Sequence, residues 1–512
     1  MINTQAIKGT VIVIVAAIMA LWLGVSVVTN QTETVLQFAG AGLLLTCIFL
    51  GRRIWLLLIL FSALNVPLIR GFGTTELGQV LFIGFTLIIT LMRRQPYKFR
   101  FGEKEVWMLL TAACILQVYL RNPIGLGIFG AGNVGAKPYF MAAITFLSSL
   151  ILGNIVVKPS EIKWAFRLSI IGSFLGIALT ALRMRGVGVT GGITKVGGIG
   201  SEGASGRMGT LGSIGLATAR VVASFVSPLK GLFHPVWAPL ILFSIAAAAG
   251  SGFRTMVATV GMMFIIGIAY RGGFPHVVFA TVSSAVLLGI LAIVNVASPL
   301  PPNVQRALSP FPGTWEKRHV EAAEGSTEWR VEMWKEALFT DYWINDKILG
   351  DGLGFTRKEL LMMEDLQSGG GSLDNRNSGM SRQQEAMMVT GGYHSGPVQT
   401  IRTVGYVGLT ILIITMIRMA VHAHRQIMRC RGTEWFPLAM YVGIPAIALP
   451  PIFIFIFGDF GRDVSAVFFS YGMISLLEKN LPLPAYVKPR YVPYVLNRHR
   501  EFAATNARPQ AR

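Results

Sequence analysis

Charged residues are scarce in this chain, and acidic residues are scarcer still. Of 512 residues, 14% are charged and 53% are hydrophobic, with 25 Asp and Glu against 45 Lys and Arg. The apolar residues form continuous runs that approach the ~20 residues an α-helix needs to cross a bilayer. The composition therefore excludes an ordinary soluble enzyme and predicts membrane-spanning helices, which satisfy their own backbone polar groups.

Cysteines and recognisable metal-ligand patterns are also few. Cys47 and Cys114 lie in apolar runs and Cys430 lies in a basic connection, so no disulfide framework is implied. His422 and His424 stand without partner ligands, and the acidic residues of the chain show no calcium-loop spacing. We expect neither a metal nor a cofactor.

Fourteen apolar runs are candidate transmembrane helices, and the one that contains Arg220 is the weakest. They cover residues 9–28, 35–50, 54–69, 77–92, 105–120, 139–157, 162–182, 209–227, 235–250, 255–270, 275–298, 403–420, 435–457 and 464–478. Lys and Arg gather in alternate connections, as the positive-inside rule predicts for cytoplasmic loops. The expected fold is an all-α polytopic membrane protein with both termini in the cytoplasm, so the net charge of +20 does not indicate a nucleic-acid partner.

This topology predicts five segments along the chain. They are the N-terminal helices (1–182), further helices (183–298), a long extracytoplasmic loop (299–402), C-terminal helices (403–478) and a basic cytoplasmic tail (479–512). The loop holds 14 of the 25 acidic residues but only 11 of the 45 basic ones. A loop this long is usually functional or disordered, so chemistry is expected here.

Two patterns in the long loop predict local structure. Residues 326–343 have helical spacing, with Trp329, Met333 and Leu338 on one side and Ser326 as a candidate N-cap. Residues 348–355 form a glycine-rich turn, which would bring the backbone close to another element.

Polar residues at the outer edges of the apolar helices are the candidates for chemistry, because ionisable groups there are costly and often functional. Arg254 lies in a break between two spans, where an anchor to lipid headgroups is equally consistent. Arg330 lies near Glu332 and one turn from Trp334, so the alternatives are cation–π packing and a solvated helix face. Arg207 begins the weak span and is either an anion contact or a boundary anchor.

His394 is the strongest single candidate in the loop. It follows Tyr393 between glycines, just before a predicted span. Imidazole titrates near neutral pH and can accept a proton from a hydroxyl, although a solvent-exposed loop histidine is the alternative. Arg402 lies two turns further on, as an anion contact or an interfacial anchor.

The order of these features resembles the O-antigen ligase superfamily, which includes O-antigen ligases, polysaccharide polymerases and O-oligosaccharyltransferases. The resemblance covers roughly residues 200–420 and is carried by Arg207-Met208-Gly209-Thr210, Ser251-Gly252-Phe253-Arg254, Glu328-Trp329-Arg330 with Trp334, Gly350-x-Gly352-x-Gly354, and His394-Ser395 with Gly405-x-x-Gly408-Leu409. Two positions depart from the family pattern, since Phe253 replaces a Ser and Ser395 replaces an Asn.

The resemblance implies a GT-C-like, metal-independent, inverting glycosyltransferase of the bacterial inner membrane with a periplasmic active site. The donor would be an undecaprenyl-diphosphate-linked glycan, and the acceptor a hydroxyl on a glycan or on lipid A core. Membrane lipids and polysaccharide-export machinery would be further partners. Fixed guanidinium groups suit a leaving diphosphate, and an imidazole suits the acceptor. Catalytic roles then fall to His394, Arg254 and Arg330, and substrate binding to Arg207, Arg402, Tyr393, Glu332 and Trp334.

Other functions stay open on the sequence alone. A transporter or flippase of lipid-linked or small solutes is the main alternative, although no clear inverted repeat is visible and acidic residues are rare within the spans. A scaffold whose long loop binds a partner is a third possibility. The sequence does not distinguish ligase, polymerase and protein O-glycosylation.

Overall fold

The computed structural model describes residues 32–69, 72–92, 101–123, 136–184, 208–354, 359, 361 and 382–482. Every predicted span within these ranges contains a helix, although the span at 54–69 is helical only to Leu64 and ends in strand β1. The predicted span at 9–28 lies outside the described residues. The helices of the N-terminal half are α2 (Thr32–Leu50), η1 (Gly51–Arg53), α3 (Trp55–Leu64), α4 (Thr74–Leu91), α5 (Glu103–Arg121), α6 (Lys137–Leu152), α7 (Pro159–Met184), α9 (Gly209–Phe225), α10 (Pro228–Gly231) and α11 (Trp237–Gly250). A two-stranded ribbon, β1 (Pro67–Ile69) and β2 (Phe72–Gly73), precedes α4.

The C-terminal half is helical too. Its elements are α12 (Arg254–Gly272), α13 (Phe274–Ala297), α14 (Pro302–Leu308), α15 (Lys317–Phe339), α17 (Arg382–Thr390), α18 (Gly396–Cys430), α19 (Phe436–Pro451), the π-helix η2 (Ile452–Ile456) and α20 (Phe460–Asn480). Among the described residues, six helices are long and apolar enough to cross a membrane: α4, α7, α12, α13, α18, and α19 together with η2. Three shorter apolar helices, α3, α6 and α11, accompany them. The chain is thus an all-α membrane protein.

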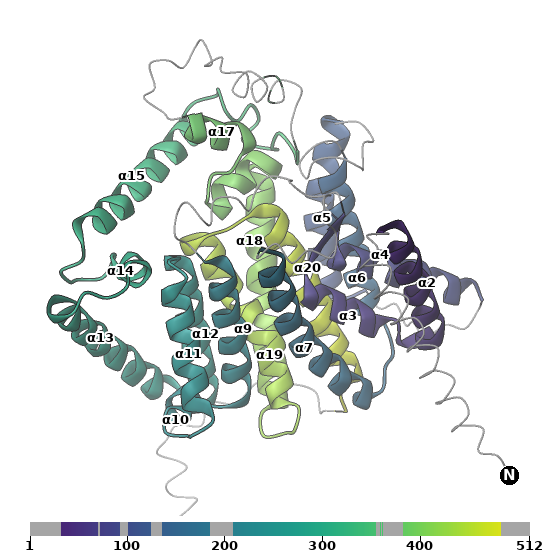
Figure 1. The fold of residues 1–512 in the computed structure, drawn as a ribbon. Coiled ribbons are helices and arrows are strands. Elements are labelled where there is room, and N and C mark those ends of the chain that lie inside the picture. The colour runs from purple at the N-terminus through teal and green to yellow at the C-terminus, as the bar shows by residue number, and fades with distance from the viewer. Residues whose placement is uncertain are drawn as a thin grey trace, which may run out of the picture.

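The helices α18, α19 and α20 pack against one another and form the centre of the bundle (Figure 1). α5 and α6 cover this centre on one side, and α9 and α12 contact α19 on the other. Met419, Met440 and Tyr471 are fully buried at the centre. Within a membrane such helices associate through close van der Waals packing and interhelical hydrogen bonds, because lipid is as apolar as the side chains it replaces.

The long loop carries its own helices at one end of the bundle. Figure 1 shows α15 slanting from α14 towards α17, which lies beside the start of α18. A second buried cluster links them, with Met333 of α15, Met388 of α17 and Val398 of α18. The long loop is therefore a folded part of the protein in these regions.

The loop helix differs from its sequence prediction at both ends. It begins at Lys317 rather than at Ser326 and ends at Phe339 rather than at 343. Good helix formers precede Ser326, and Lys317 forms an i,i+4 ion pair with Glu321. The helix ends early because the chain becomes extended at Thr340 and returns residues 343 and 344 to the buried cluster. The predicted apolar side is confirmed, since Met333 is buried between Trp329 and Leu338.

Candidate functional site

The glycine-rich turn at residues 345–353, here called the docking turn, attaches the long loop to a break in α18. At Gly405 the backbone is non-helical, with φ 72° and ψ −178°. The helical partners of the Tyr406 and Val407 N–H groups would be the carbonyls of Arg402 and Thr403, four residues earlier. Those carbonyls accept instead from the docking turn.

The docking turn and the break exchange four backbone hydrogen bonds. Tyr406 and Val407 donate to the carbonyls of Lys347 and Ile348, at 2.8 and 3.2 Å. In return, the N–H groups of residues 351 and 352 donate to the carbonyls of residues 402 and 403, at 2.7 and 3.1 Å. A Cβ on Gly405 would overlap the carbonyl of Ile348. The two glycine motifs, separate in the sequence, therefore form one contact.

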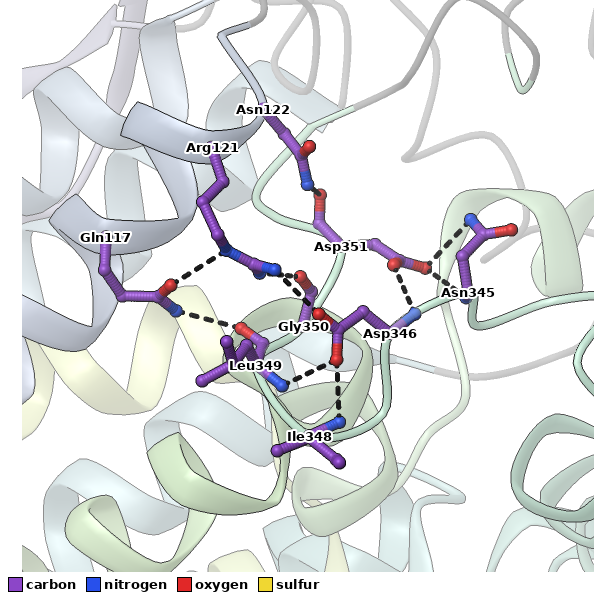
Figure 2. A network of polar contacts seen from close by, with 9 residues as sticks. All are labelled: Gln117, Arg121, Asn122, Asn345, Asp346, Ile348, Leu349, Gly350 and Asp351. Carbon is purple, nitrogen blue, oxygen red and sulfur yellow. Dashed lines mark hydrogen bonds and ion pairs between the residues drawn. The ribbon is translucent and has the colours of Figure 1, made fainter.

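Helix α5 holds the other side of the docking turn (Figure 2). Arg121 donates to the Asp346 carboxylate and to the Gly350 carbonyl, each at 2.6 Å, and Gln117 donates to the Leu349 carbonyl at 2.9 Å. The Asp346 carboxylate also accepts from the Leu349 N–H at 2.9 Å. These backbone N–H groups, together with Arg121, hold the pKa of Asp346 below its ordinary value. The docking turn is thus fixed to two helices, α5 and α18.

His394 lies at the junction between α17 and α18. Its φ of 51° is in the left-handed region, which non-glycine residues seldom adopt and which often marks a functional constraint. Its half-buried imidazole lies 5.6 Å from the ring of Phe457, centroid to centroid. Gly396 and Gly458 come into direct contact just behind it, so α18 starts close against the chain between η2 and α20. The fold therefore fixes the backbone of His394 at this junction, with the imidazole beside Phe457.

Trp334 connects the loop helix to this junction. Its indole Nε1–H donates to the Tyr393 carbonyl at 2.7 Å. Of the two alternatives for Arg330, cation–π packing is not formed, because Arg330 and Trp334, both of them described, do not stack. The Tyr393 side chain is fully buried, which raises the pKa of its hydroxyl to about 12. Trp334 thus holds the backbone at Tyr393, the residue that precedes His394.

Arg402 is buried below the junction rather than at a membrane surface. It is 6% exposed and pairs with Glu359. Its side chain lies directly under Gly391, where a Cβ would collide with the guanidinium. A lipid-headgroup anchor would be exposed. Arg402 therefore forms an internal ion pair with Glu359, and its side chain packs against the 391–394 segment.

Three arginines from different elements are linked by their charges, at the start of α12, on α14 and midway along α15. Arg254 starts α12, Arg306 lies on α14 and Arg330 lies on α15, and all three are half-buried. The guanidinium of Arg254 experiences the positive charges of Arg330 and Arg306. Burial lowers the pKa of Arg330, whose Nε has no hydrogen-bond partner. We call Arg254, Arg306 and Arg330 the arginine cluster.

The remaining predicted residues are placed as follows. Arg207 lies outside the described residues, but the Met208 N–H next to it donates to the Ser251 carbonyl at 3.0 Å. The start of α9 therefore lies beside the turn that carries Arg254. Glu332 is exposed on α15, whose buried side is formed by Met333 and its neighbours. It does not join the cluster.

Two arginines were missed in the sequence. Arg306 is one of many basic residues in the loop, and no spacing distinguishes it. Arg462 lies 5.2 Å from the Phe457 ring centroid, on the ring that also contacts His394. Its position just before an apolar run, like that of Arg254, was the available signal. It also forms an ion pair with Asp463 at 2.8 Å.

The described residues contain no group of three or more His, Cys, Asp and Glu that could hold a metal ion. Positive charge near His394 is supplied by guanidinium groups. No protein-family model matches the chain, and no curated protein matches it significantly.

Proposed function

We propose that the chain is a glycosyltransferase that moves a glycan from a polyprenyl-diphosphate carrier to a hydroxyl acceptor at the outer face of a bacterial inner membrane. The arginine cluster is the observation that carries this proposal. The half-buried guanidinium of Arg254 experiences the positive charges of Arg330 on α15 and Arg306 on α14, and a bound polyanion would offset them. A diphosphate presents several oxygens to such a cluster at once.

A connected path in the fold links this cluster to His394. Arg330 and Trp334 are one helical turn apart on α15, and residues at this spacing lie on neighbouring parts of one face. Trp334 holds the carbonyl of the residue before His394. The polyanion site and the imidazole are therefore supported by the same helix, which favours a two-substrate reaction over binding alone.

The chemistry follows from these positions. The acceptor hydroxyl oxygen attacks the anomeric carbon and forms the new glycosidic bond, while its proton passes to the imidazole of His394. The bond from the anomeric carbon to the diphosphate oxygen breaks, and the diphosphate leaves with the electron pair. Guanidinium groups stabilise the charge that develops on it. Direct displacement inverts the anomeric configuration.

The topology proposed with this function has fourteen spans, both termini in the cytoplasm and the 299–402 loop outside. Ion pairs support it by joining connections that the charge pattern assigns to the cytoplasm, namely Arg53–Glu161, Lys163–Glu434 and Lys104–Glu478. Contacts between these connections require them to lie at one end of the bundle. The docking turn is held instead by the opposite end of α5, at Arg121.

Variants at His394 and Arg254 test the proposal with purified protein, a polyprenyl-diphosphate-linked glycan and an acceptor. His394→Asn tolerates the left-handed backbone and removes the base, so transfer is expected to fall at least ~10²-fold. Arg254→Lys is expected to lose activity as well, because an ammonium group lacks the bidentate fork. Arg167→Lys, at an arginine stacked 5.1 Å over Trp164, is the control.

Full turnover in His394→Asn would remove the imidazole from the mechanism. Full activity with Lys at position 254 would demote that residue to a headgroup anchor. Movement of the lipid-linked glycan across a vesicle without bond cleavage would favour the transporter or flippase instead. Loss of the outer glycan from lipopolysaccharide after gene deletion would indicate a ligase, and single-repeat chains would indicate a polymerase.

A further inference from the structure

Two adjoining cavities lie inside the membrane bundle, away from His394. One, of ≈ 650 Å³, lies between α3, α7, α9, α12 and α19, and the other, of ≈ 480 Å³, extends from it towards α4, α6 and α20. They share six lining residues: Ala63, Asn65, Ser173, Arg220, Tyr441 and Pro445. Arg220 therefore stands where the two cavities meet.

The fold fixes the orientation of Arg220. Its guanidinium carbon lies 3.8 Å from the ring centroid of Tyr441, and its Nε donates to the Tyr441 carbonyl at 2.9 Å. In a regular helix that carbonyl accepts from the residue four positions later, which here is Pro445 and has no N–H. Pro445 thus frees the carbonyl that Arg220 uses. The other guanidinium nitrogens are left for the cavities.

None of the described carboxylates forms an ion pair with this arginine, and Glu76, which lines the smaller cavity, accepts from the Gly73 N–H instead. Arg220 belongs to none of the ion pairs of the described residues, and its only hydrogen bond among them is the one from Nε. A charge within a membrane span is costly and is therefore a hypothesis for a binding site. Hydroxyl and amide side chains that line the same cavity, at Ser169, Ser173 and Asn65, supply further hydrogen-bonding groups.

We propose that these cavities bind an anionic amphiphile, with its phosphate at Arg220 and its hydrocarbon chain in the larger cavity. The wall that leads away from Arg220 is lined by apolar side chains such as Leu216, Met256 and Met263. It follows one face of α9 from Arg220 to Gly209, which is 11 residues or about 16 Å of helix. That length suits a lipid chain and exceeds the needs of a free inorganic ion.

Arg220 lies far along α9 from the arginine cluster. About 16 Å of helix separates it from Gly209, at the end of α9 that lies beside the turn carrying Arg254. A phosphate bound at Arg220 is therefore remote from the proposed diphosphate site, and the hydrocarbon chain runs from it towards the Gly209 end. Binding at Arg220 does not depend on the proposed reaction.

Native mass spectrometry of the full chain in detergent tests this site. The probes are phosphatidylglycerol, which is anionic, and phosphatidylcholine with the same acyl chains, which is neutral overall. Wild-type protein is expected to retain phosphatidylglycerol preferentially, and Arg220→Gln is expected to weaken that binding at least tenfold. Arg271→Gln is the matched control, because Arg271 also stacks on an aromatic ring (Phe436) and donates to a carbonyl but lines neither cavity.

A second variant covers the case in which Arg220→Gln fails to fold. Ser173→Phe keeps the arginine and fills the space the cavities share, so it is also expected to exclude the lipid. Equal phosphatidylglycerol binding by wild type and both variants would overturn the proposal. Stabilisation by inorganic phosphate as large as that by phosphatidylglycerol would show a free-anion site instead, and would refute the amphiphile.

Discussion

Replacing Gly405 by Ala tests how strongly the docking turn is held to α18. Alanine would have to adopt a φ of 72°, which costs about 1–2 kcal/mol for a residue with a Cβ, and this Cβ would overlap the Ile348 carbonyl. If the docking turn separates, its four backbone hydrogen bonds to α18 are lost, but the Tyr406 and Val407 N–H groups can return to their helical partners, the carbonyls of Arg402 and Thr403. Only the docked state carries the cost of the strained φ and the overlap, so its stability should fall by at least ~1.4 kcal/mol, or about tenfold in the opening equilibrium.

Hydrogen–deuterium exchange of the detergent-solubilised protein measures this opening directly. The amides of Asp351 and Gly352, which have no helical partner to return to, should exchange at least ~10-fold faster in the variant. Gly261→Ala is the matched control, because a Cβ on this helical glycine of α12 meets nothing within 4 Å. Protection of these two amides that is the same in all three proteins would refute the proposed coupling between the break and the docking turn.

Two further perturbations probe the loop. Trp334→Phe leaves the buried Tyr393 carbonyl without its donor and should destabilise the 391–396 segment by about 1–3 kcal/mol in hydrogen-exchange measurements. The control is Trp329→Phe, which should cost less because the indole N–H of Trp329 has no partner. Equal effects of the two substitutions would contradict a stabilising role for the Trp334–Tyr393 hydrogen bond. Because the pKa of Asp346 is lowered in the folded protein, its carboxylate contributes to folding stability above the ordinary carboxyl pKa of about 3.9, and this contribution is lost as the pH falls through the lower folded value. Melting curves from pH 7 to 3 should therefore show a weaker pH dependence of stability for Asp346→Asn than for the wild type. Identical profiles would show that this carboxylate does not contribute to the pH dependence.

The sequence by itself determined the helical membrane architecture. Long apolar runs leave a chain in lipid few alternatives to helices, because unpaired backbone groups cannot be hydrated there. The same local logic located the apolar side of α15 and the position of His394 just before a helix. These features depend on residues within a few turns of one another, which the sequence displays directly.

The ends of elements and the connections between motifs were decided by tertiary structure. α18 begins at Gly396, earlier than the predicted 403, because the glycine contact with Gly458 accommodates its first turn. It breaks at Gly405 because backbone groups from a turn about fifty residues earlier replace its own hydrogen bonds. Neither partner is close in sequence, so no local pattern predicts the event.

The arginines show the same division. The sequence identified Arg254 and Arg330 as candidate functional charges, yet it could not show that Arg306 of α14 adds its charge to the environment of Arg254. It marked Arg220 only as a weakness in a predicted span, whereas the fold matches it to the carbonyl that Pro445 leaves free on another helix. Local periodicity determines which residues form helices, but the partner of a buried charge or an unpaired carbonyl depends on which helices meet.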